Sequence, residues 1–282
     1  MEISSLVSTN NRVCSLSLGA FALLLWTFVV VGCNPNRTTD RTQIELDSIL
    51  FSDELSLRVD ADTPTMFVSI NYFYPKSDKK LLRRFNAIFF GDSLAHLEPA
   101  EAMQVYIKYL QQTYRADNYS YSELADNLPG ELFDQAFELS DSVAYSDSLF
   151  VCMRVSQYEE KGGAHESTSQ TYYNINRENA EILSEQDLFV DGYRDELSDI
   201  IVACLLEQLG KKSPRDLENE GYFNAEEIMP NGNFAIGEKG LTYCFNEYEI
   251  AAYAMGTIYV FIPYERLQSI LKPDAPIKNY LP

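Results

Sequence analysis

The sequence predicts an α+β fold, with antiparallel sheets and packed helices that follow a signal peptide and a flexible tether. Short runs rich in β-branched and aromatic residues alternate with runs of helical periodicity. Short turn sequences separate neighbouring strand-like runs, which favours local hairpins over repeated βαβ units. Apolar residues make up 46% of the chain and aromatic residues 13%, enough to build the core of one large or two small domains.

The N-terminal segment predicts export and lipidation. Residues 20–31 form an apolar run of about a dozen residues, whereas a membrane-spanning helix needs about 20. The sequence Val-Val-Gly-Cys that ends at Cys33 has the pattern of a bacterial lipobox, with Gly32 at the cleavage site and Cys33 as the residue that receives a diacylglycerol. The alternatives are an ordinary secretory peptide and a short anchor helix with an incidental cysteine. We expect a signal peptide over 1–32 and a lipidated cysteine with its flexible tether over 33–62.

The charge of the chain limits its partners. The formal net charge is −20, and loss of residues 1–32 removes one acid, Glu2, and one base, Arg12, so the mature chain keeps that charge. Such a chain repels nucleic acid and anionic lipid head groups, and it attracts cationic partners. An acidic surface can also serve solubility alone. We therefore expect no nucleic-acid partner.

Strands and helices alternate along the rest of the chain. Residues 66–75 read as a strand, 79–90 as a helix that Gly91 ends, and Pro99 as the start of a second helix. The inward face of that second helix is predicted to contain Ala102, Val105, Tyr106, Tyr109, Leu110 and Thr113.

The second half begins with two strands over 136–160, and "STSQTYYNIN" reads as the strand that returns after a Gly-Gly turn. Ser184 is placed to cap a short helical turn, with Asp187 three residues on. The remaining predicted elements are a helix over 193–209, a hairpin with its turn at 238–240, a strand over 257–263 and a closing helix over 264–271.

The cysteines provide no metal or cofactor motif. Cys14 lies in the signal segment, and Cys152, Cys204 and Cys244 lack close spacing. Each of these three sits in an apolar pattern, which favours buried free thiols; a bridge between two of them is the alternative. We expect no cofactor and no metal.

A series of motifs resembles a known family. "GGAH", "YYNIN", "LSEQDLF", "NFAIGEKGLTYCFNEYEIAAYAMG" and "VFIPYERLQSIL" occur in the order found in the DUF3298 family of bacterial envelope proteins, which covers 161–282 here. Residues 63–160 resemble, more loosely, the DUF4163 domain that often precedes it. The resemblance implies an α+β module of cell-surface and periplasmic proteins. Its relatives include an anti-sigma factor that senses lysozyme by binding it and a peptidoglycan deacetylase.

Departures from the family pattern bear on function. The chain has two histidines, His96 and His165, and lacks the metal-binding histidines that a deacetylase requires. Ala252 stands where the family has proline in "YEIAPYA", and Glu166 follows "GGAH" where relatives often carry proline, glycine or asparagine. These differences affect the surface on which a partner would be bound.

Two function classes remain. The first is a lipid-anchored binding module of the bacterial cell envelope, facing the periplasm or the exterior, that captures a cationic protein such as lysozyme or a cell-wall glycan (peptidoglycan). Its candidate binding residues are Gly162, Gly163, His165, Tyr248 and Tyr253, because aromatic residues beside glycine turns make large contacts at low entropic cost.

The alternative is a cell-wall hydrolase that uses His165 with nearby carboxylates, such as Glu159 and Glu160 or Glu247 and Glu249. A chain with 42 acids places such pairs together by chance, and no hydrolase, phosphate-loop or zinc motif is present. We therefore assign no catalytic residue and favour the binding module. The two classes differ in one spatial requirement, because an enzyme needs His165 and a carboxylate to converge in one cleft.

Overall fold

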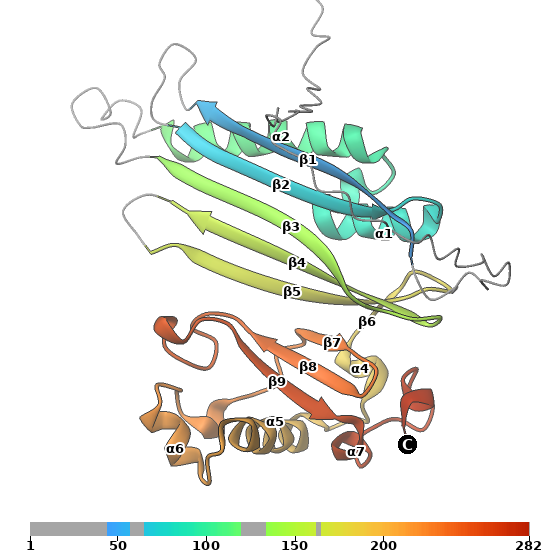
Figure 1. Ribbon diagram of the computed structural model, residues 1–282, viewed down its shortest axis with the longest axis vertical. Coiled ribbons are helices and arrows are strands. Elements are labelled where there is room, and N and C mark those ends of the chain that lie inside the picture. Colours follow the sequence, from blue (N-terminus) through green and yellow to red (C-terminus); the bar gives the residue numbers. More distant parts are fainter. Residues whose placement is uncertain (1–43, 57–64, 120–133, 162–164, 282) are drawn as a thin grey trace, which may run out of the picture. The chain divides into compact units, whose positions relative to one another are not determined.

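Two β-sheets form the framework of this computed structural model, which describes residues 44–56, 65–119, 134–161 and 165–281 (Figure 1). The six strands of the larger sheet lie in chain order, and all neighbours are antiparallel except β2 and β3. They are β1 (Leu46–Ser56), β2 (Thr65–Pro75), β3 (Gln135–Ser146), β4 (Phe150–Glu160), β5 (Ser167–Asn176) and β6 (Ile182–Leu183). The smaller sheet is antiparallel and contains β7 (Phe234–Ile236), β8 (Gly240–Phe245) and β9 (Ile258–Pro263). The predicted α+β class is confirmed.

The parallel pairing of β2 with β3 departs from the antiparallel sheet that we predicted. Helices α1 (Lys79–Phe90) and α2 (Pro99–Asp117), with the 3₁₀ turn η1 (Asp92–Leu94) between them, lie in the connection between these strands. A parallel pair needs a crossover of a dozen or more residues, and these helices provide it. Hairpin patterns alone do not show this pairing.

Helices α1 and α2 cover one face of the six-stranded sheet (Figure 1). The Asp78 side chain caps α1 by accepting hydrogen bonds from the backbone N–H groups of Lys80 and Leu81, and Gly91 ends the helix at a φ of 97°. Their shared core contains Val68, Ile70, Tyr72, Leu81, Phe85, Phe89, Met103, Tyr114, Val151 and Met153. On α2 the predicted inward face is partly wrong, because Val105 and Tyr109 are exposed while Met103 and Tyr114 are buried. Apolar residues on several sides of this helix leave its rotation undetermined by periodicity.

The smaller sheet has its own core. Helix α5 (Arg194–Leu209) packs on β9 and ends at Gly210 in the left-handed conformation, as predicted. The other helical segments are α4 (Glu185–Leu188), α6 (Pro214–Asn219), α7 (Tyr264–Leu267), η3 (Ala225–Glu227), η4 (Tyr253–Met255) and η5 (Lys278–Tyr280). Ser184 and Asp187 form the predicted capping box of α4. Within β4, Phe150 belongs to this second core whereas Val151 and Met153 belong to the first, so the strand is buried on both faces.

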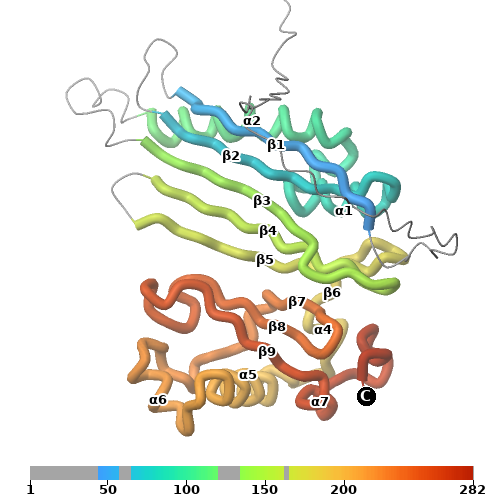
Figure 2. Tube along the Cα trace, in the orientation of Figure 1, coloured from blue at the N-terminus to red at the C-terminus, as the bar shows by residue number. Residues whose placement is uncertain are grey.

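Side chains, in place of a strand, cover the outer edge of β5. Strand β6 pairs only with residues 174 and 175 of β5. Along the rest of that edge, the amides of Thr168, Gln170 and Tyr172 donate to the side chains of Glu247 (3.2 Å), Asn246 (2.7 Å) and Asn233 (2.9 Å). The amide groups of Asn246 and Asn233 also donate to the carbonyl of Gln170, at 3.1 and 2.8 Å. These bonds join β5 to the turns of the smaller sheet, which runs beside it (Figure 2).

The buried side chain of Asn174 extends this junction in the opposite direction. Its amide donates to the carbonyl of Phe234 at 2.7 Å, and its oxygen accepts from the amide of Ile236 at 2.8 Å. One side chain therefore satisfies the donor and the acceptor that the edge of β7 presents. The two sheets are joined through asparagine side chains where backbone pairing stops.

Two predicted boundaries need correction. The tether was predicted over 33–62, but Leu46–Ser56 is strand β1, an edge strand in which Leu55 is buried while most polar residues are exposed. The segment carries the acids Asp47, Asp53 and Glu54, and its apolar residues do not alternate regularly with polar ones. Charges are typical of an edge strand, and together with the weak periodicity they made the segment resemble a tether. The predicted boundary between 160 and 161 separates β4 from β5, two strands that pair along their whole length.

The closing helix is shorter than predicted and ends at Leu267. Ile270 and Leu271 leave the helical path because the carbonyl of Ile270 accepts from the amide of Val190, and Leu271 forms a bridge with Phe189. Tertiary pairing thus overrides the helical pattern.

The three cysteines in the described ranges, Cys152, Cys204 and Cys244, are buried free thiols, as predicted. Cys14 and Cys33 lie outside those ranges. Within the same ranges, no helix has both the length and the apolar character needed to cross a bilayer.

A buried carboxyl group lies where the parallel pairing of β2 and β3 ends. Asp141 accepts a hydrogen bond of 2.7 Å from the amide of Phe73 through one oxygen, and its other oxygen is buried with no partner among the described residues. Burial raises the pKa of this carboxyl to about 7, despite the opposing effect of the bond from Phe73. In the unfolded chain the carboxyl titrates near its ordinary value of about 3.9. Ionisation of Asp141 therefore destabilises the fold increasingly as the pH rises from about 4 to 7.

We predict that Asp141→Asn becomes stabilising as the pH rises. Asparagine keeps the acceptor for Phe73 and cannot ionise, so its advantage in the free energy of unfolding should increase by roughly 2–3 kcal/mol between pH 5 and pH 8. Denaturant unfolding at several pH values measures this change, with Asp199→Asn, at an exposed position of α5, as the control. An advantage independent of pH would contradict the assignment of a buried, raised-pKa carboxyl.

Candidate functional site

Three of the predicted binding residues form a continuous stack of rings, which we call the aromatic stack: His165, Tyr253 and Tyr248. The rings of His165 and Tyr253 have centroids 5.3 Å apart and are inclined by 24°. The rings of Tyr253 and Tyr248 are 5.5 Å apart and inclined by 27°. These are offset-stacking distances, so the three side chains support one another. His165 and Tyr248 are exposed, and 60% of Tyr248 is accessible to solvent.

The stack is assembled from segments far apart in the sequence. His165 precedes β5, Tyr248 follows β8, and Tyr253 begins η4. The hydroxyl of Tyr253 donates a hydrogen bond of 2.9 Å to the carbonyl of Glu166, which connects η4 to the segment that enters β5. Nearby in the sequence, the backbone amide of Thr168 donates a hydrogen bond to the carboxylate of Glu247, the residue before Tyr248. Glu247, one of the side chains that cover the edge of β5, therefore also fixes the segment that carries Tyr248.

The backbone beneath Tyr248 is constrained. Tyr248 has a φ of 65°, in the left-handed region that residues other than glycine rarely occupy. The preceding turn is held by a bond from the amide of Glu249 to the carbonyl of Asn246, and the Glu249 carboxylate accepts from Asn231 at 2.7 Å. A strained conformation kept by surrounding contacts is a feature often found at binding sites.

Carboxylates surround the stack. Partial burial, with the nearby Glu166 and Glu247, raises the pKa of the Tyr253 hydroxyl. Partial burial with Glu160 and Glu166 raises the pKa of Tyr158 in the same way. The environment of the stack is therefore negatively charged. Such a surface favours ligands that carry positive charge beside apolar or aromatic groups.

Among the described residues, no catalytic arrangement is seen around His165. No carboxylate within the described ranges forms a hydrogen bond or ion pair with His165, whose ring contact is with Tyr253. One acid of each predicted pair has another partner, because Glu159 forms an ion pair with Lys161 at 2.8 Å and Glu249 accepts a hydrogen bond from Asn231. The part of the chain that the structure describes also has no group of three or more His, Cys, Asp or Glu residues arranged to hold a metal.

The other predicted site residues, and the second histidine, either lie outside the described ranges or belong to a different surface. Gly162, Gly163, Gly32 and Cys33 lie outside the described residues. His96 belongs to a different surface, beside α1.

The two departures from the family pattern are compatible with the observed backbone of the stack. Ala252 has a φ of −63°, the value that proline would impose at this position. Glu166 contributes its carbonyl oxygen to Tyr253, a role that does not depend on its side chain. Tyr158, which lies near the stack, was not among the predicted site residues. Its position near the end of the strand that precedes "GGAH" could have identified it.

Comparisons with known proteins agree on the second half of the chain. Residues 186–265 match the family described as "Protein of unknown function (DUF3298)". A DUF3298 family member from Bacteroides fragilis NCTC 9343 is similar in structure, with a TM-score of 0.77 and 28% identity over 84% of this chain and 97% of the other. A DUF3298 family protein from Pseudomonas aeruginosa PAO1 has a TM-score of 0.58 at 18% identity, over 85% of this chain and 97% of the other, and supports the fold alone. No match was found among curated proteins.

The matched residues include α5, the smaller sheet and two members of the aromatic stack, Tyr248 and Tyr253. His165 and β5 precede the matched residues. The amides of β5 join the two parts by donating hydrogen bonds to the side chains of Asn233, Asn246 and Glu247. The DUF4163 resemblance of residues 63–160 stays a prediction. Residues 186–265 of the chain thus match the DUF3298 family, which is described as a family of unknown function.

Proposed function

We propose that the protein is a lipid-anchored binding module of the bacterial cell envelope that captures a cationic protein, such as lysozyme, through the aromatic stack. The observation that carries this proposal is the stack itself, in which His165, Tyr253 and Tyr248 present rings at the surface among carboxylates. Aromatic residues provide most of the binding energy in many interfaces because they bury a large area with few rotatable bonds.

Charge and aromatic contact have separate roles in this proposal. The net charge of −20 attracts a basic partner over long distances and raises the association rate, an effect that salt weakens. Attraction of this kind selects for charge and little else. Burial of the stack against the partner provides specificity, because the rings are held in place before binding and lose little entropy.

The alternative of a cell-wall hydrolase has no observation in its favour. It requires a carboxylate within hydrogen-bond reach of His165, and the described contact of that ring is with Tyr253. A cell-wall glycan is the other partner that exposed rings can bind, and it is therefore an outcome of the test below.

The first prediction of this proposal concerns the anchor. We expect acylation of Cys33 and the absence of residues 1–32 from the mature protein, because the lipobox pattern places Gly32 and Cys33 in the order that lipoprotein processing uses. The intact mass of protein extracted from membranes measures both changes. Cys33→Ala should release the protein from the membrane, and a variant that stays bound to the same extent would contradict the anchor.

The second prediction concerns the stack. The whole chain, purified in detergent, should bind lysozyme at about 150 mM salt. Tyr253→Ala should weaken the affinity by about tenfold or more, since it removes the central ring of the stack. Tyr253→Phe keeps the ring and should retain most of the affinity. Titration calorimetry, with circular dichroism to verify folding, measures these effects.

Tyr109→Ala is the control, because Tyr109 is a tyrosine on α2 that is as exposed as Tyr248 and lies far in sequence from the stack. Its effect on affinity should stay within about twofold. Two results would overturn specific capture of lysozyme: wild-type binding that disappears at physiological salt, or equal affinities of Tyr253→Ala and Tyr109→Ala for lysozyme. Binding to purified peptidoglycan that depends on Tyr253, without binding to lysozyme, would replace the protein partner with the glycan.

A further inference from the structure

A concentrated basic segment stands out in this acidic chain. Residues 79–84, "KKLLRR", contain four of the 22 lysine and arginine residues of a protein with a net charge of −20. The segment forms the first half of α1, where Lys80, Arg83 and Arg84 have helical spacing and project to neighbouring positions. Four cations in six residues is a local reversal of the charge of the whole molecule.

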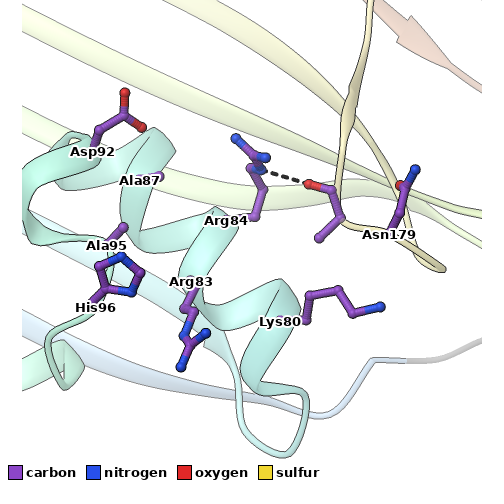
Figure 3. Close-up of a pocket in the computed structure, with 9 residues that line it drawn as sticks. Lys80, Arg83, Arg84, Ala87, Asp92, Ala95, His96 and Asn179 are labelled. Carbon is purple, nitrogen blue, oxygen red and sulfur yellow. Dashed lines mark hydrogen bonds between the residues drawn. The ribbon is translucent and has the colours of Figure 1, made fainter.

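Three of these four cations line a pocket. Its volume is ≈ 370 Å³, and its walls come from α1, from the segment around η1 that carries Asp92 and His96, and from the turn between β5 and β6 (Figure 3). Lys80, Arg83 and Arg84 all contribute to the lining, and Asp92 is the acid among the residues that line it. The lining therefore carries a net positive charge.

The structure positions two of the cations through backbone oxygens. The Nε of Arg84 donates to the carbonyl of Ala180 at 2.6 Å (Figure 3). The Nζ of Lys80 donates to the carbonyl of Glu178. Carbonyl acceptors orient these side chains without neutralising them. The bond to Ala180 engages Nε, which leaves the two terminal nitrogens of the guanidinium directed away from that contact.

Arg83 lies on the side of α1 nearer to His96 and is exposed (Figure 3). Among the described residues, no carboxylate forms a salt bridge with Lys80, Arg83 or Arg84, although the chain has 42 acids. An exposed arginine can change rotamer at little cost, so Arg83 can close over a ligand in the pocket.

We propose that this pocket binds a small anion that carries a phosphate group. Two guanidinium groups provide planar, charge-assisted donors that match phosphate oxygens, and one ammonium group adds a third positive charge. Three cations beside one acid suit a dianionic ligand better than a singly charged carboxylate. The pocket is at the small end of the range for ligand sites, which suits one phosphate group with a small substituent. The overall negative field disfavours an extended polyanion. This proposal does not depend on the aromatic stack or on its partner.

Titration calorimetry with the whole chain tests the proposal, with inorganic phosphate and glycerol phosphate as the soluble probes and sodium chloride at equal ionic strength as the blank. We expect saturable binding of both probes. Arg83→Ala and Arg84→Ala should each weaken it by about tenfold, the loss expected for one charge-assisted hydrogen-bond pair. Arg215→Gln, at an exposed position of α6, is the matched control and should change the affinity by less than about twofold.

Vesicles distinguish a lipid source of the phosphate group from a soluble one. If the ligand is a lipid head group, the protein should bind phosphatidylglycerol vesicles better than phosphatidylcholine vesicles, and Arg83→Ala should abolish the difference in a form that also carries Cys33→Ala. If soluble phosphate binds and the vesicles do not differ, the ligand is a soluble phosphate compound. Failure of both soluble probes and both vesicles to bind would overturn the proposal, as would binding that Arg83→Ala, Arg84→Ala and Arg215→Gln all leave unchanged.

Discussion

The outer edge of β5 depends on hydrogen bonds from side chains that replace a neighbouring strand. A strand edge presents unpaired N–H and C=O groups, and burying them without partners costs about 1–3 kcal/mol each. Here Asn233, Asn246 and Glu247 pair with those groups, and Asn174 performs the same function for the edge of β7. The two sheets are therefore joined without a continuous backbone ladder between them, because each of these bonds involves a side chain.

The same bonds place the candidate site. Glu247 pairs with Thr168 only one residue away from Tyr248, and Tyr253 bonds to Glu166 at the entrance to β5. The aromatic stack therefore lies at the end of the junction between the sheets, and it combines His165 with residues of the DUF3298 domain. The basic pocket beside α1 is lined mainly by residues from the first half of the chain, and its charge is opposite to that around the stack. A chain with two surfaces of opposite charge can engage two different partners.

Local patterns in the sequence predict most of the elements and little of how they meet. Gly91 and Gly210 mark helix ends, and the capping box at Ser184 marks a helix start, because these signals act within a single turn of chain. Strand β1 was missed because its apolar residues do not alternate regularly with its acids and serines. The end of α7 was missed because Leu271 pairs with Phe189, which is distant in the sequence.

The candidate site shows the same limit. His165, Tyr248 and Tyr253 could be proposed from glycine turns and from the family resemblance, but their stacking could not. It occurs where side chains such as Asn233 and Asn246 join β5 to the smaller sheet. Asparagines near turns are common, so the sequence does not distinguish a residue that covers a strand edge from one that only shapes a turn. Hydrogen exchange of single backbone amides tests this role most directly. The amides of residues 170 and 172 should exchange slowly in the wild type, and Asn246→Ala and Asn233→Ala should respectively speed them by about tenfold or more. Rapid exchange in the wild type, or no change in the variants, would contradict the account.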